Sequence, residues 1–186
     1  MSLYKFGTIG PDGSDAPYFY DDIYQVEETA RSRRLLVAPR KDHIAVLSEL
    51  ADRLSGPYRL LYVLLVGRTG RAEGRYETAE FLTASDLRSF LSTHGPFLEH
   101  DGRHHFWIGS AQGDALLVYD QHNVIFAYGP LDEFARVLVR RGLRSSTVSY
   151  PGPHTHHYHA AYDAAEDRLF SEREWLFSPL REQDEP

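Results

Sequence analysis

The chain has 186 residues, 42% of them apolar and 25% charged, and a globule of this length buries about 70% of its unfolded surface without help from a metal or disulfide. It contains no cysteine, which excludes disulfides, thiolate catalysis and cysteine-based metal sites. The net charge of −7 argues against a nucleic-acid-binding protein, and the lack of a long apolar run argues against a membrane span.

Residues 1–17 are expected to form a loop-rich N-terminal segment, because glycine, proline and aspartate are concentrated between positions 7 and 17. The first ten residues lack the charged-then-apolar pattern of an export signal, so we expect a cytoplasmic protein. Eighteen of the twenty cationic residues are arginine, a skew that indicates a GC-rich bacterial genome.

Three tyrosines, Tyr18, Tyr20 and Tyr24, follow among acidic residues. Tyrosine supplies a large contact area at low entropic cost, so these side chains are candidates for binding a protein partner. The alternative is an N-terminal strand whose tyrosines pack on the core.

The middle of the chain predicts two helices and a buried pair of strands. Apolar residues at three-to-four spacing predict a helix over 42–54. Residues 58–66 are almost continuously apolar, which is typical of a central strand, and 75–82 return as its antiparallel partner. A capping box at Thr83–Asp86 begins a second helix, which we expect to end at Gly95-Pro96.

A three-strand meander is predicted next, over 104–108, 115–119 and 124–128, because three β-rich runs are separated by turn residues. A third helix is expected over 130–142, where acidic residues open the first turn, arginines close the last, and Gly142 caps the C-terminus.

The C-terminal part predicts two strands over 143–150 and 151–162, a turn at 163–167, a last strand or short helix at 169–177, and a solvated acidic tail at 181–186. No linker or repeat divides residues 1–186. The sequence therefore predicts a single α+β domain with a mainly antiparallel sheet of about six to eight strands and three helices packed against it.

Four histidines within six residues are the densest local concentration of metal-ligand chemistry in the chain: His154, His156, His157 and His159. On an extended strand the first two face one way and the last two the other. A pair at i, i+2 can bind a borderline metal such as zinc, but a catalytic site needs a third ligand from elsewhere. The candidates are His104, His105, His122, Asp120 and Asp163.

Two sets of site residues follow. For a metal we select His154, His156 and His105, if the meander lies beside the histidine strand. For proton transfer we select His156, His159, His122 and Asp120, because an aspartate beside a histidine can fix its tautomer and raise its basicity. Ordinary turn chemistry also explains the Asp120–Asn123 segment, and it is the favoured explanation.

Two classes of function remain open. The first is a soluble, non-enzymatic bacterial adaptor that binds a protein partner and needs no cofactor, of which an immunity-type inhibitor is one example. The second is a small hydrolase or isomerase-like enzyme that uses the 154–159 histidines, with or without zinc. Convergence of at least two of these histidines in a pocket, with a carboxylate in hydrogen-bonding reach, favours the enzyme.

Overall fold

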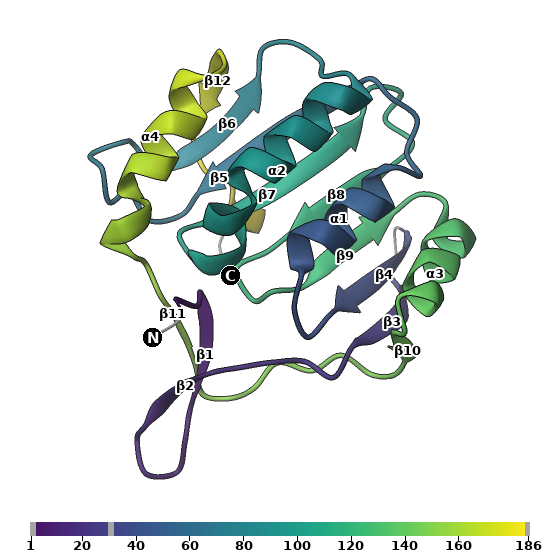
Figure 1. The fold of residues 1–186 in the computed structure, drawn as a ribbon, viewed down its shortest axis with the longest axis vertical. Helices are drawn as coiled ribbons and strands as arrows, with labels where there is room; N and C mark the ends of the chain where they lie inside the picture. Colours follow the sequence, from purple (N-terminus) through teal and green to yellow (C-terminus); the bar gives the residue numbers. More distant parts are fainter. Residues whose placement is uncertain (1–2, 30–31, 185–186) are drawn as a thin grey trace.

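A large β-sheet organises the chain in the computed structural model, which describes residues 3–29 and 32–184 (Figure 1). Among the described residues this sheet has nine strands in the order β10-β3-β4-β9-β8-β7-β5-β6-β12. Their bounds are β3 Ile23–Glu28, β4 Arg33–Ala38, β5 Tyr58–Leu64, β6 Gly74–Thr78, β7 His104–Ser110, β8 Leu116–Tyr119, β9 Ile125–Tyr128, β10 Arg144–Ser145 and β12 Trp175–Ser178.

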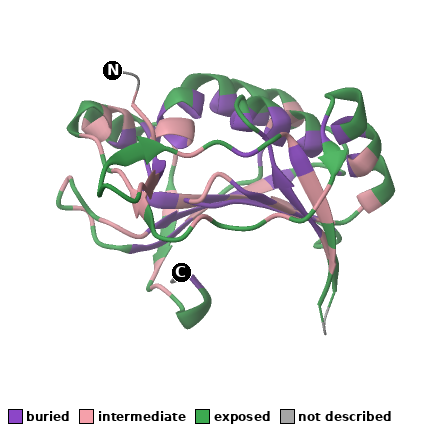
Figure 2. Ribbon diagram, turned by 90° about the horizontal axis from the view of Figure 1, so that it is seen from below, coloured by how far each residue is buried: buried purple, intermediate pink, exposed green. Residues whose placement is uncertain are grey.

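Four α-helices of the described chain cover one face of this sheet, as the view along the sheet in Figure 2 shows. They are α1 His43–Ala51, α2 Ala84–His100, α3 Leu131–Arg140 and α4 Asp163–Ser171. Between helices and sheet lies the main core, which takes alternate residues of the central strands, for example Phe106 and Ile108 of β7. None of these helices combines the length and apolar character needed to cross a membrane.

A second, three-stranded sheet contains β1 Phe6–Ile9 between β2 Asp15–Pro17 and β11 His154–His156. Phe6 and Tyr20 pack with Leu36, Ala38 and Val124 in a smaller core. Because Leu36 and Ala38 alternate along β4 with residues of the main core, this small core lies on the face of the large sheet that the helices leave open.

The α+β class is confirmed, whereas its details differ from the expectation of a mainly antiparallel sheet of about six to eight strands with three helices. The sheet has nine strands and is mixed, because β10 pairs in parallel with β3. The fourth helix, α4, replaces the turn expected at 163–167. Its Leu169 is buried in the main core, and its Glu166 is buried against Arg103.

The second helix was expected to end at Gly95-Pro96, but α2 continues to His100. Proline inside a helix removes one backbone hydrogen bond. The helical turn after Pro96 buries the side chains of Phe97 and Leu98, and this burial offsets the lost hydrogen bond.

Both terminal segments are more ordered than expected. The loop-rich segment 1–17 contains β1 and β2, and its residues 1–2 lie outside the described chain. The solvated tail expected over 181–186 contains a short 3₁₀ helix, Glu182–Asp184, whose Asp184 is fully buried and pairs with Arg75. A buried guanidinium needs a counter-charge, which explains why this end is held; residues 185–186 are not described.

Candidate metal centre

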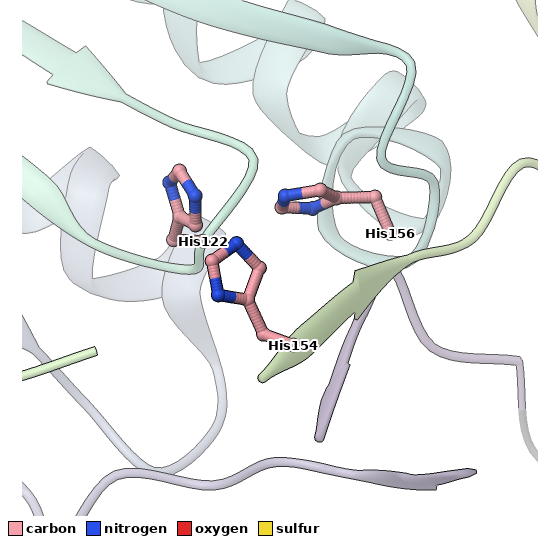
Figure 3. A group of neighbouring side chains, drawn as sticks. All are labelled: His122, His154 and His156. Carbon is pink, nitrogen blue, oxygen red and sulfur yellow. The ribbon is translucent and has the colours of Figure 1, made fainter. Parts of the chain in front are cut away.

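Three histidines from two distant parts of the chain meet beside the small sheet: His122, His154 and His156. His122 lies in the turn between β8 and β9, and the other two lie on β11. One nitrogen of each ring lies within 4.8 Å of the corresponding nitrogens of the other two. Figure 3 shows the three rings directed toward a common space.

Strand pairing explains why the two β11 histidines lie together. β11 pairs antiparallel with β1, where His156 is opposite Phe6 and His154 is opposite Thr8. Because side chains alternate along a strand, both rings point to the same side, and their centroids are 5.3 Å apart.

The phenyl ring of Phe6 packs against all three imidazoles. Its centroid lies 5.4 Å from that of His122, 5.5 Å from that of His154 and 5.6 Å from that of His156. Phe6 is fully buried, so it forms a fixed apolar floor that limits how far the three rings can move apart.

Asp120 fixes the orientation of His122. Its Oδ2 accepts a hydrogen bond from His122 Nδ1 at 2.8 Å, while its Oδ1 accepts from the backbone N–H groups of His122 and Val124. Burial alone would raise the pKa of Asp120, but the hydrogen bond and charge of His122 outweigh it and hold this pKa below its usual range. The ionised carboxylate only accepts, so in the neutral imidazole Nδ1 carries the proton and Nε2 has a free lone pair.

The other two rings have comparable features. His154 Nδ1 lies 3.0 Å from the carbonyl oxygen of Pro151; a carbonyl only accepts, so Nε2 again keeps its lone pair. His156 Nδ1 is buried with no hydrogen-bond partner in the described chain. Burial and the neighbouring His122 and His154 lower the pKa of His156 to about 4, so this ring is neutral at pH 7, the form that binds metal.

The donor set fits zinc. Zinc takes imidazole nitrogens at about 2.0–2.1 Å, and two nitrogens of a tetrahedral site are therefore about 3.4 Å apart. Ligand atoms that lie within 4.8 Å of one another need only small side-chain rotations to reach that geometry. Three protein ligands would leave a fourth position for water or substrate, which is typical of catalytic zinc sites.

A cleft of about 730 Å³ opens beside these rings on the helix-free face of the large sheet. Asp120, His122 and His154 line one part of it. Its floor comes from neighbouring residues of β7, β8 and β9, in which Trp107 pairs with Val118 and Val118 with Phe126. The histidines therefore lie at the border of an apolar cleft.

The remaining predicted site residues lie elsewhere. His105 lines the cleft, its Nε2 is buried without a partner in the described part of the chain, and burial lowers its pKa to about 4; it does not belong to the group of three. His159 lies on the opposite side of the strand, where Nε2 bonds the carbonyl oxygen of Tyr4 at 2.8 Å. His157 pairs there with Asp15.

The three tyrosines selected for partner binding do not share one environment. Tyr20 is buried, and its ring stacks on Phe6. Tyr18 is half-buried and packs on the small core, whereas Tyr24 is half-buried against the main core.

Sequence reasoning missed two residues that surround the histidines, Phe6 and Tyr150, because strand pairing brings them there and their sequence neighbourhoods carry no distinguishing pattern. Tyr150 lies 4.8 Å from His122 between ring centroids, and both Tyr150 and Arg34 line the cleft. Arg34 belongs to the cationic run 31–41, whose sequence allows an anion-binding strip, although cations that face solvent are the favoured explanation. Comparison with known proteins gives no match to a protein family, to a curated protein or to a solved structure.

Proposed function

We propose that this chain is a metal-dependent hydrolase in which His122, His154 and His156 hold a zinc ion. The observation that carries the proposal is the convergence of three imidazoles at the border of a cleft, with the Asp120 carboxylate hydrogen-bonded to one of them. Convergence with a carboxylate in reach is what distinguishes a catalytic site from scattered surface histidines.

The protein's own residues have defined parts in this proposal. Asp120 keeps His122 in one tautomer and raises its basicity as a ligand, an arrangement common in zinc sites. Phe6 and the apolar floor of the cleft restrict water around the ligands. A zinc ion with an open position supplies a water molecule whose pKa is about 7, and this water can be added across an ester, amide or phosphoester bond.

The adaptor hypothesis stays a second proposal with weaker support. It relied on an aromatic surface around Tyr18–Tyr24, and Tyr20 of that group is buried. Exposed aromatic side chains do occur nearby, namely Phe19 at 53% and Tyr150 at 43% exposure, but Tyr150 belongs to the cleft beside His122.

The test uses untagged protein loaded with zinc and a panel of chromogenic 4-nitrophenyl esters and phosphoesters. We expect at least one substrate to be hydrolysed, with the rate abolished by a chelator and restored by zinc or cobalt. His122→Ala should abolish the reaction, whereas His157→Ala, on the far side of the strand, should leave it unchanged. Absence of hydrolysis across the panel, or equal rates in His122→Ala and wild type, would remove the hydrolase proposal and favour the adaptor.

A further inference from the structure

We infer that the cleft selects amphipathic substrates that carry an anionic group at one end and the hydrolysable bond at the other, with Arg34 as the residue that recognises the anion. This inference rests on the proposed hydrolase function, since it assigns the reacting end of the cleft to His122, His154 and His156. It is drawn from the distribution of charge and apolar surface along the cleft.

The cleft runs along β9, away from the histidines. His122 lies in the turn that precedes β9, and the cleft-facing residues Phe126 and Tyr128 follow it. Arg34 on β4 reaches the far end, because its neighbour Leu35 pairs with Ala127. An extended chain from 124 to 128 is about 13 Å long, so the two ends of the cleft are separated by the length of a small linear molecule.

The surface between the two ends is mainly apolar, apart from Nε1 of Trp107, which has no hydrogen-bond partner within the part of the chain that the structure describes. Trp107, Val118 and Phe126 are direct cross-strand neighbours on the open face, and Leu116 lies beside them. Burial of aliphatic or aromatic groups against such a floor is favourable, because it removes apolar surface from water. The middle of a bound substrate should therefore be hydrocarbon.

Arg34 supplies hydrogen-bond donors at the far end; its charge is paired with the Glu27 carboxylate, and its guanidinium is held in place. Nε bonds Glu27 and Nη1 bonds the Tyr128 hydroxyl at 2.7 Å, while the group stacks on Phe126 at 4.6 Å from the ring centroid. Nη2 has no hydrogen-bond partner among the residues described. This arrangement leaves one fixed N–H edge available to a carboxylate or phosphate oxygen.

Two hydroxamates of equal chain length test the inference, because a hydroxamate coordinates zinc and anchors one end of the probe. Suberic acid monohydroxamate carries a carboxylate at its far end, and octanohydroxamate carries a methyl group. Titration calorimetry on the zinc-loaded protein should show that suberic acid monohydroxamate binds about tenfold more tightly than octanohydroxamate. This is the difference in affinity expected from one charge-assisted hydrogen bond. Arg34→Gln should abolish this preference, while Arg33→Gln, at an exposed neighbouring position, should preserve it.

The outcomes separate the inference from the function on which it rests. Equal affinity of the two probes in wild type, or a preference that survives Arg34→Gln, overturns the inference and leaves the metal site intact. Failure of both probes to bind zinc-loaded protein also overturns it, whereas failure to load zinc removes the proposed function and the inference with it. If Arg34→Gln does not fold, the salt dependence decides: the wild-type preference must weaken as sodium chloride is raised, and a salt-independent preference contradicts recognition by Arg34.

Discussion

Oδ2 of Asp120 accepts the Nδ1–H of His122 at 2.8 Å, and both groups lie in the turn that joins β8 to β9. Ordinary turn chemistry accounts for the two backbone hydrogen bonds that Oδ1 accepts. The second oxygen, Oδ2, bonds the ring of His122 instead of the backbone. This hydrogen bond fixes which nitrogen of His122 is free. The same aspartate therefore closes the turn and orients His122, the proposed metal ligand.

Asp120→Asn should lower zinc affinity by about 10–100-fold, the usual effect of removing a carboxylate that supports a metal-binding histidine. Asparagine keeps an acceptor for the turn but removes the charge that favours Nδ1–H on His122. Competition with a chromophoric zinc chelator measures the change. Asp114→Asn, at an exposed position in the preceding loop, serves as the control, and unchanged affinity in Asp120→Asn would show that Asp120 only closes the turn.

Asp101→Asn should destabilise the fold by roughly 2 kcal/mol, because the amide cannot accept all the hydrogen bonds that the buried carboxylate accepts, although Glu166 and Asp163 still neutralise Arg103. Asp101 and Arg103 are both fully buried and joined by two side-chain hydrogen bonds, and Asp101 also accepts the backbone N–H of His159 at 2.8 Å. Urea denaturation gives the free energy of unfolding. The exposed pair in which Asp52 accepts from Arg88 provides the comparison, since Asp52→Asn should cost less than about 1 kcal/mol; equal costs would mean that the buried network adds nothing.

Lys5→Met should stabilise the metal-free protein at pH 6, and the gain should shrink between about pH 7 and pH 10.5. Burial lowers the pKa of Lys5 to about 7, against partial compensation from Asp120 and Glu99. The unfolded chain holds this proton up to about pH 10.5, whereas the native state releases it above about pH 7. Stability of the wild type therefore rises with pH across that window.

Chemical denaturation of wild type and Lys5→Met at several pH values measures this linkage, with a chelator present so that metal binding does not contribute. The difference at pH 6 should be a few kcal/mol, on the order expected for three pKa units. A difference that stays constant from pH 6 to pH 10 would contradict the buried, uncharged state of Lys5.

Glu99→Gln should cost about 1–2 kcal/mol at pH 7, since Glu99 takes the part of an N-cap for α1. Its two oxygens accept the backbone N–H groups of His43 and Ile44, whereas Asp42 at the N-cap position makes no such bond. Burial would raise the pKa of Glu99, but the hydrogen bond and charge of His43 and these two N–H groups lower it to about 2. Because the pKa of Glu99 is lower in the folded than in the unfolded state, its carboxylate stabilises the fold fully above about pH 4.5. This stabilisation is lost as the pH falls toward 2. The stabilities of wild type and Glu99→Gln should therefore converge when both are titrated with acid.

Local patterns predicted the elements whose signals are contained in short segments. The capping box at Thr83–Asp86 is confirmed, with both of its hydrogen bonds present. The central strand β5 and the β7-β8-β9 meander are confirmed as well. Gly142 has the positive φ of 89° expected of a helix C-cap.

Features that depend on distant partners could not be predicted in the same way. The alternation of His154 and His156 against His157 and His159 followed from strand geometry. The role of His122 required the pairing of β11 with β1, which brings Phe6 beneath all three rings. Likewise, α4 replaces a predicted turn because Glu166 meets Arg103, 63 residues away in the chain.

Zinc titration of untagged protein by calorimetry is the sharpest test of the proposed site at His122, His154 and His156. We expect one zinc ion per chain, with an affinity that falls by more than about 100-fold in His122→Ala and stays unchanged in His159→Ala, whose ring bonds Tyr4 on the other side of the strand. Wild-type protein that takes up no stoichiometric zinc, or two variants that lose affinity equally, would contradict it.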